Sequence, residues 1–233
     1  MIHFSHVYKT YPGPVHALQN LDLEIKKGEF VFLTGPSGAG KTTLFRMISG
    51  YDQPNSGKVT VAGYDLTKIT ARELPYFRRR IGVVFQDFRL LADRTVFENV
   101  ALPLDIRGEK TSFVDKKVNE ALSNVGLLFK KNQLPEQISG GEQQRVAIAR
   151  ALVHQPMILI ADEPTGNLDP DLSEEIIDLL DRVNAQGTTV FVATHDVELV
   201  NKRSCRVVQL KAGRISGDKE EDKREEQGME RSL

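Results

Sequence analysis

A glycine-rich segment between an apolar run and a helical pattern constrains the fold of this chain most strongly. Residues 35–42 read Gly-Pro-Ser-Gly-Ala-Gly-Lys-Thr and fit the phosphate-loop pattern G-x-x-x-x-G-K-[ST] without a mismatch. The apolar run at residues 30–33 precedes it, and residues 42–48 have helical spacing. Amides of such a loop and of the helix that follows cradle phosphate oxygens. The segment therefore predicts a nucleotide site at the end of a strand in an α/β domain.

Two side chains at the end of this loop have the chemistry that a nucleoside triphosphate requires. Lys41 is expected to reach the β- and γ-phosphates, and Thr42 to offer its hydroxyl to Mg²⁺. The alternative is a glycine-rich turn with a chance lysine, which the flanking strand and helix disfavour. These residues alone fit ATP or GTP. The loop residues assigned to the nucleotide are Gly35, Pro36, Ser37, Gly38, Ala39, Gly40, Lys41, Thr42 and Thr43.

Two carboxylates, Asp162 and Glu163, follow the apolar run at residues 157–161. Ligands of open parallel sheets gather at the carboxyl ends of the strands. Asp162 is therefore expected on the Mg²⁺ side of the loop, acting through coordinated water, and Glu163 is free to polarise the attacking water as a general base. The alternative, a polar cap on the turn at Pro164, is weakened by the presence of the phosphate loop.

His195 and Gln86 follow two further apolar strand patterns. At a strand end His195 can donate a hydrogen bond to the γ-phosphate as a sensor, although a single histidine is more often structural. Gln86 is similarly placed to meet Mg²⁺ or the attacking water. The predicted catalytic set is Glu163, His195 and Gln86, and the predicted metal set is Thr42, Gln86 and Asp162.

A second anion-binding element is predicted at residues 138–145, which read Ile-Ser-Gly-Gly-Glu-Gln-Gln-Arg and open a helix that runs to about residue 152. Ser139 is a natural N-cap, and Glu142 three residues later completes a capping box. The box explains the serine and the glutamate but not Gly140 and Gly141. We expect both glycines to leave the helix N-terminus bare for an anion.

Together these segments resemble the motifs of the ABC ATPases. Residues 139–143 match the signature motif, Gln86 the Q-loop, residues 167–169 (Asn-Leu-Asp) the D-loop and His195 the switch histidine. The resemblance covers about residues 1–216. It implies an ATP-hydrolysing enzyme of the α/β P-loop NTPase class, with a RecA-like core, an antiparallel β subdomain and an inserted α-helical subdomain.

The resemblance also implies where ATP lies. In that family ATP is held between the phosphate loop of one subunit and the signature helix of another, and this chain has one copy of each. A homodimer in the ATP-bound state is therefore expected, with Tyr11 stacked on adenine. The resemblance adds Tyr11, Ser139, Gly140, Gly141, Glu142 and Asp169 to the nucleotide-binding residues.

One branch of the family is the most similar. Residues 161–169 and 141–146 resemble the cell-division, lipoprotein-release and macrolide-exporter ATPases, and residues 32–41 and 90–101 are most similar to the cell-division type. The resemblance implies an integral membrane partner, FtsX in that type, which contacts the groove between the sheet domain and the helical insertion. Residues 86–96 would border that groove. It also implies control of peptidoglycan hydrolases in cell division from the cytoplasmic face of the plasma membrane. A lipoprotein-release or macrolide-exporter complex stays open as the alternative.

Strand patterns frame a central helical block. Strand-like runs fill most of the first sixty residues and return after residue 156, whereas residues 96–152 have helical periodicity. Alternation of strand and helix indicates a parallel sheet covered by helices. We predict an ATPase domain over residues 1–217, with a helical subdomain inserted at about 87–155. A charged, disordered tail is expected at 218–233.

Composition limits the partners. The 233 residues carry a formal net charge of −1, so no general basic field favours nucleic acid. No apolar run approaches the ~18 residues that span a bilayer, and no secretory signal is visible, so membrane contact is expected through a partner. The single cysteine, Cys205, lies in an apolar run and is expected to be a buried hydrophobe in a reducing compartment.

Overall fold

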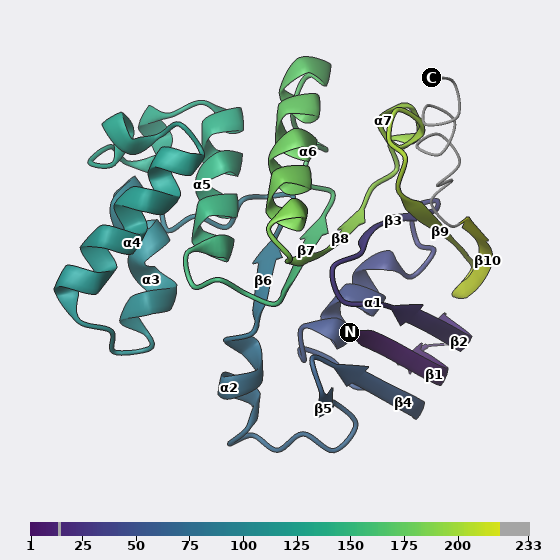
Figure 1. Ribbon diagram of the computed structural model, residues 1–233. Coiled ribbons are helices and arrows are strands. Elements are labelled where there is room, and N and C mark those ends of the chain that lie inside the picture. The colour runs from purple at the N-terminus through teal and green to yellow at the C-terminus, as the bar shows by residue number, and fades with distance from the viewer. Residues whose placement is uncertain (14, 220–233) are drawn as a thin grey trace, which may run out of the picture.

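The computed structural model describes residues 1–13 and 15–219 as two sheets with helices between and around them (Figure 1). The element bounds are β1 (Ile2–Tyr11), β2 (Val15–Ile25), β3 (Phe30–Thr34), α1 (Lys41–Ile48), β4 (Ser56–Val61), β5 (Tyr64–Asp65), α2 (Leu74–Arg78), β6 (Ile81–Val84), α3 (Val96–Asp105), α4 (Thr111–Asn124), η1 (Leu128–Lys130), η2 (Pro135–Gln137), α5 (Gly140–Leu152), β7 (Ile158–Asp162), α6 (Pro170–Ala185), β8 (Thr189–Ala193), α7 (Val197–Asn201), β9 (Arg206–Lys211) and β10 (Arg214–Lys219).

The larger sheet has six strands in the order β10-β9-β3-β8-β7-β6. Its pairs are parallel except β10 with β9. Side chains of β3 alternate between two cores: Phe30 and Phe32 belong to one, and Val31 and Leu33 to the other. A parallel strand buried on both faces appears in the sequence as a continuous apolar run. The carboxyl ends of β3, β7 and β8 meet at one edge of this sheet.

The smaller sheet is antiparallel, in the order β2-β1-β4-β5, and lies beside α1 (Figure 1). One core joins residues of both sheets with the buried face of α1, which includes Leu44, Phe45 and Ile48. The helix that begins at the phosphate loop is therefore held between two sheets. This packing fixes the direction in which its N-terminus points.

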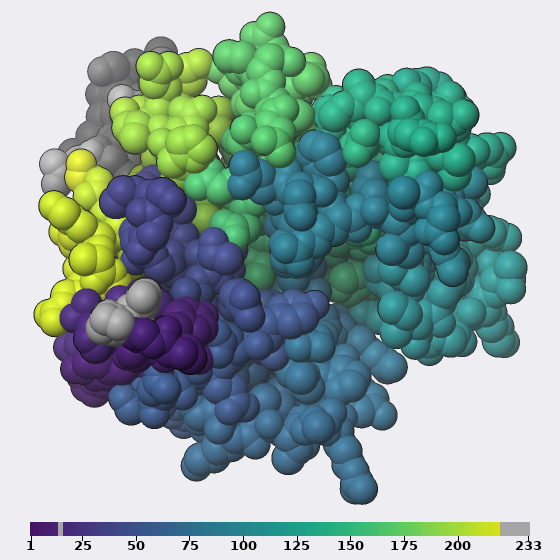
Figure 2. Space-filling model, turned by 180° about the vertical axis from the view of Figure 1, so that it is seen from behind, coloured from purple at the N-terminus to yellow at the C-terminus, as the bar shows by residue number. Residues whose placement is uncertain are grey.

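Helices α3, α4 and α5 lie between β6 and β7 in the chain and gather at one side of the molecule (Figure 1). They pack mainly on one another, and seen from behind they form the lobe at the right of Figure 2. In α4, Val114, Val118 and Leu122 are buried, and Ala121 packs against the same core, so one face of this helix is apolar.

Two expectations need correction. The predicted tail boundary at residue 218 is wrong by two residues, because β10 extends through Lys219 and Arg206 donates to both oxygens of Asp218 at 2.9 and 2.8 Å. The rest of the predicted tail, residues 220–233, lies outside the described residues. Cys205 is half-buried against the core rather than fully buried. Within residues 1–13 and 15–219, no helix is long and apolar enough to cross a bilayer.

Candidate nucleotide site

A cleft of about 640 Å³ lies beside the N-terminus of α1, at the carboxyl ends of β7 and β8. This is the edge of a parallel sheet where ligands bind. Its lining brings together most of the predicted phosphate-loop, acidic and histidine residues, and adds His16 and Ala17, which sequence reasoning missed. The lining residues are Tyr11, His16, Ala17, Ser37, Gly38, Ala39, Gly40, Lys41, Thr42, Thr43, Gln86, Asp162, Glu163 and His195.

The backbone of the phosphate loop explains two of its glycines. Gly35 has φ +150° and Gly40 has φ +110°, in the region that favours glycine. A Cβ on Gly35 would lie 2.1 Å from the Leu210 carbonyl oxygen, and one on Gly40 would lie 2.5 Å from that of Ala17. Both glycines are therefore required by packing against neighbouring segments, in addition to the phosphate contact expected from sequence.

Lys41, Glu163 and His195 form a continuous chain of contacts in the cleft. The Lys41 Nζ donates to the Gly35 carbonyl at 2.7 Å and lies 3.6 Å from Glu163 Oε1. Glu163 Oε2 accepts hydrogen bonds from the His195 amide at 3.2 Å and, in the tautomer that protonates it, from His195 Nδ1 at 2.8 Å. Lys41 is only 8% exposed, so water screens its charge weakly. The predicted base, sensor and phosphate lysine therefore meet in space.

The backbone at Glu163 is strained. Its φ is +50°, a conformation that costs a non-glycine residue about 1–3 kcal/mol and clusters at functional sites. The Glu163 amide donates to the Ala193 carbonyl at 2.9 Å, and the next carbonyl, that of Pro164, accepts from Gln144 Nε2 at 2.6 Å. Gln144 is fully buried and comes from α5. Sequence reasoning missed it, because no local pattern joins residues twenty positions apart.

Asp162 and Thr42 have the donor set that Mg²⁺ takes from a protein. Burial raises the pKa of Asp162, a hydrogen bond with Thr42 opposes the rise, and the charge of Glu163 adds to it by a smaller amount. No cluster of three acidic, histidine or cysteine side chains occurs in the described part of the chain. One carboxylate and one hydroxyl suit a cation that keeps waters and takes further ligands from substrate phosphates.

Tyr11 lies at the border of the cleft and is fixed by contacts that the sequence did not predict. Its hydroxyl donates to Asp52 Oδ2 at 2.6 Å, Lys9 pairs with the same carboxylate, and the Lys9 ammonium lies 5.0 Å from the Tyr11 ring centre. Burial and Asp52 raise the pKa of the Tyr11 hydroxyl. The ring is therefore held at the cleft, and its stacking on adenine stays a prediction.

The segment after Gln86 is held in an unusual conformation. Phe88 and Arg89 have φ values of +56° and +49°. Arg150, at the far end of α5, donates to their carbonyl oxygens at 2.7 and 2.6 Å. The Gln86 carbonyl accepts from Asn167 Nδ2 at 3.1 Å. The segment 86–89 is thus tied to the signature helix through Phe88 and Arg89, and to the predicted D-loop through Gln86.

The signature residues do not line this cleft within one chain. Ser139 caps α5, and Glu142 completes the predicted capping box. Gly140 is exposed, and a Cβ on it would meet nothing closer than 4.0 Å. Gly141 is buried, and its Cβ would lie 2.9 Å from Leu172, so the expectation that both glycines leave the helix end bare is wrong for Gly141. Asp169 caps α6 through the Leu172 amide at 2.9 Å.

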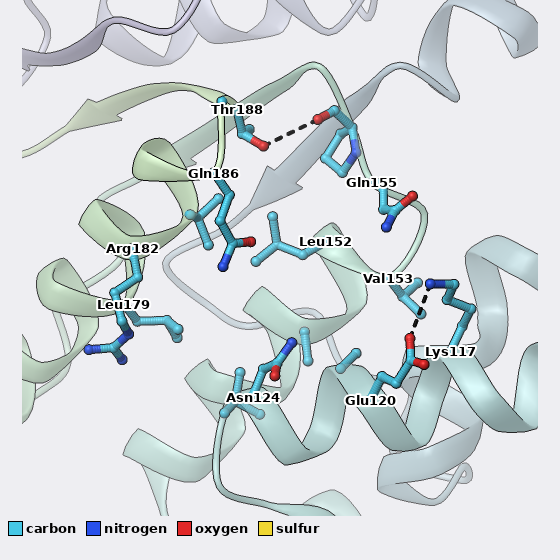
Figure 3. A pocket seen from close by; sticks show the side chains of 16 residues that line it. Lys117, Glu120, Asn124, Leu152, Val153, Gln155, Leu179, Arg182, Gln186 and Thr188 are labelled. Carbon is cyan, nitrogen blue, oxygen red and sulfur yellow. Dashed lines mark hydrogen bonds and ion pairs between the residues drawn. The ribbon is translucent and has the colours of Figure 1, made fainter.

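A second cleft of similar volume, about 620 Å³, lies between α4, the end of α5 and α6 (Figure 3). Its lining includes Lys117, Glu120 and Asn124 of α4, Arg182 of α6, and Gln186, which directly follows α6 (Figure 3). It also contains residues 155–156 and 187–188, which precede β7 and β8. This edge of the sheet is opposite the one where ligands of parallel sheets bind, so position rather than volume assigns the nucleotide to the first cleft.

The fold and the first cleft define the class of protein: a P-loop ATPase with a separate signature helix. Comparison with known proteins identifies the family. The sequence model described as ABC transporter matches residues 18–166, and the chain belongs to that family. It is an ABC-type ATPase, as the motifs predicted.

Similar proteins of known name indicate which branch of the family the chain resembles. The chain is 50% identical to the cell division ATP-binding protein FtsE of Escherichia coli over 217 residues, 93% of this chain and 98% of the relative. It is also 50% identical to FtsE of Mycobacterium tuberculosis over 221 residues, 94% and 96% of the two chains. A dimeric structure of the ATP-binding cassette MJ0796 in a post-hydrolysis state, bound to ADP and Pi, superposes with a TM-score of 0.86 at 39% identity, covering 94% of this chain and 98% of that chain. These findings confirm the predicted fold class and the predicted similarity to FtsE.

Proposed function

We propose that this chain is the ATP-hydrolysing subunit of a cell-division complex of the FtsE–FtsX type. Closure of two copies around ATP would be transmitted to an integral membrane partner and so control peptidoglycan hydrolases. The observation that carries the catalytic part is the contact chain of Lys41, Glu163 and His195 in one cleft. Similarity to proteins named FtsE supports the cell-division branch over the lipoprotein-release or macrolide-exporter alternative.

Glu163 is the proposed general base. His195 anchors one of its oxygens and Lys41 faces the other, so the carboxylate is held where it can take a proton from the attacking water, an effect of ~10²–10⁴-fold. Lys41 neutralises charge on the phosphates, and His195 senses the γ-phosphate. Proton transfer from water to Glu163 accompanies attack on the γ-phosphorus and gives ADP and phosphate.

Thr42 and Asp162 are the proposed Mg²⁺ ligands, with Gln86 at the edge of the same cleft. When bound, Mg²⁺ neutralises the charge of the phosphates and polarises the γ-phosphoryl group. Asp162 supplies the charge, and its burial keeps competing water away from that charge.

The signature helix of a second copy is proposed to complete the site. None of Ser139, Gly140, Gly141 and Glu142 lines the cleft of its own chain, and the exposed Gly140 leaves the start of α5 accessible to another molecule. The dimeric, nucleotide-bound form of the similar cassette supports this arrangement. The chain would lie on the cytoplasmic face of the plasma membrane, held there by its partner.

The catalytic proposal is tested by Glu163→Gln. Phosphate release should fall by ~10²–10⁴-fold, because the amide cannot accept the proton. Binding of a fluorescent ATP analogue should persist, and Lys41→Ala provides the comparison that should lose it. Turnover at the parent rate in Glu163→Gln would rule out this base.

The choice of branch is tested by reconstitution. The chain is expressed with the FtsX-type membrane protein of its own genome and, separately, with a lipoprotein-release permease. Co-purification and stimulated ATP hydrolysis are expected only with the first. Stimulation by the second alone would move the chain to the alternative branch while leaving its ATPase chemistry unchanged.

A further inference from the structure

The signature helix α5 carries a carboxylate at the end where a phosphate is proposed to bind. Glu142 Oε2 accepts hydrogen bonds from the Ser139 amide at 2.9 Å and the Ser139 hydroxyl at 3.2 Å. Amides and the helix dipole attract one anion at such an end, and a carboxylate in the first turn opposes a second. The side chain that caps α5 therefore works against the binding of a phosphate there.

A lysine from another segment balances this charge. Lys130, the last residue of η1, has its Nζ 2.5 Å from Glu142 Oε1. The Lys130 and Glu142 side chains are 23% and 15% exposed, so solvent screens the pair only partly. The hydrogen bond from Lys130 is the main reason that the pKa of Glu142 is lowered. Both carboxylate oxygens are thus bound within the chain, Oε2 by Ser139 and Oε1 by Lys130.

Two further pairs with the same bonds, within residues 1–13 and 15–219, show that capping itself needs no cation. Thr95 and Glu98 open α3, and Thr70 and Glu73 precede α2, with the same reciprocal hydrogen bonds. Neither Glu73 nor Glu98 forms an ion pair with any residue in 1–13 or 15–219. Of these three glutamates, only Glu142 of α5, the helix assigned to a phosphate, is therefore paired with a lysine.

We infer that Lys130 is a positioning residue for ATP at the dimer interface. It cancels the charge of Glu142 and keeps that carboxylate engaged within its own chain, so that α5 can accept a phosphate of the ATP bound to the second copy. This inference rests on the proposed function, because it requires the signature helix of one copy to meet the nucleotide of the other.

The test measures ATP-driven dimerisation in the Glu163→Gln background by sedimentation velocity at low and high salt. Adding Lys130→Met, which keeps an aliphatic side chain and removes the ammonium, is expected to weaken the dimer about tenfold at low salt. The defect should shrink at high salt, where charges are screened. Adding Glu142→Gln as well should restore the dimer, since glutamine also completes a capping box and leaves no charge to cancel.

Lys131→Met is the matched control. It removes the same charge one residue away, but Lys131 Nζ donates to Asn119 Oδ1 of α4 at 3.4 Å and not to Glu142. The Lys131→Met dimer should therefore be as stable as the parent dimer. An ion pair that only held η1 on α5 would lower the melting temperature of Lys130→Met, and Glu142→Gln would not restore dimerisation.

Three results would overturn the inference and leave the proposed function intact: an unaffected Lys130→Met dimer, a defect that persists with Glu142→Gln, or an equal defect in Lys131→Met. A Glu163→Gln parent that stays monomeric with ATP would overturn both proposals.

Discussion

Two helices of this chain begin at segments assigned to phosphate, and their N-termini are built in opposite ways. α1 follows Gly40, which has φ +110°, and it has no side-chain cap and no acidic residue in its first turn. α5 follows Ser139, and a full capping box with Glu142 closes its first turn. The first end is left open by its own chain, whereas the second is capped by its own side chains and leaves only Gly140 exposed.

The surroundings of the two helix ends differ in the same sense. The start of α1 shares a cleft with Asp162, Glu163 and His195, so its chemistry is assembled within one chain. The start of α5 exposes Gly140 and shares no cleft with those groups. The difference fits the proposed function, in which one end binds nucleotide within a single chain and the other acts on nucleotide held by a second copy.

The largest expected effect is the difference in single-chain ATP affinity between a substitution at the start of α1 and one at the start of α5. Lys41→Ala is expected to weaken ATP binding by a single chain on the order of 100-fold, because a nearly buried charge partner of the phosphates is lost. Gly140→Asp should leave that affinity near the parent value, since α5 takes no part in it. Titration of a fluorescent ATP analogue at protein concentrations below dimerisation measures both. An equal loss of ATP affinity in both variants would contradict the difference between the two helix ends.

A smaller effect is expected on stability when each of the two glycines of α5 is replaced by alanine. A methyl on Gly141 would press on Leu172 at 2.9 Å, whereas one on Gly140 would meet nothing closer than 4.0 Å. Gly140→Ala should therefore be more stable than Gly141→Ala by about 1 kcal/mol, or roughly 2–4 °C in melting temperature for a chain of this size. Thermal unfolding of the two variants, each against the parent, gives the difference. The reverse order would contradict the packing of Gly141 on α6.

An effect of similar size, but confined to part of the pH range, concerns two carboxylates whose pKa values are shifted in opposite directions. Burial raises the pKa of Asp162, so its ionised form costs stability above that pKa. Asp162→Asn should then be more stable than the parent near neutral pH by about 1 kcal/mol, with the advantage lost as pH falls through the raised pKa. Lys130 lowers the pKa of Glu142, so Glu142→Gln should be less stable near neutral pH, with the deficit lost as pH falls through the lowered pKa. Denaturant unfolding across a pH series, without nucleotide or Mg²⁺, checks both signs.

The phosphate loop and the acidic pair could be predicted because their chemistry lies in short, contiguous segments. Residues 35–42 specify a strand–loop–helix turn on their own, and the run before Asp162 places it at a strand end. The roles of Gly141, Lys130 and Gln144 could not be read in this way, since each depends on a residue 12 to 31 positions away. The end of β10 was missed for the same reason, because Asp218 is held there by Arg206.

We propose that the hydrolytic site is shared between two chains, and one measurement tests this sharing most directly. Sedimentation velocity with ATP and Mg²⁺ compares Glu163→Gln with Glu163→Gln/Gly140→Asp. The second variant adds a negative charge at an exposed position where a Cβ would meet nothing closer than 4.0 Å in the monomer. We predict a dimer for the first and a monomer for the second, with equal melting temperatures and equal ATP affinity of the single chain. A dimer in both, or a monomer in both, would contradict the shared site.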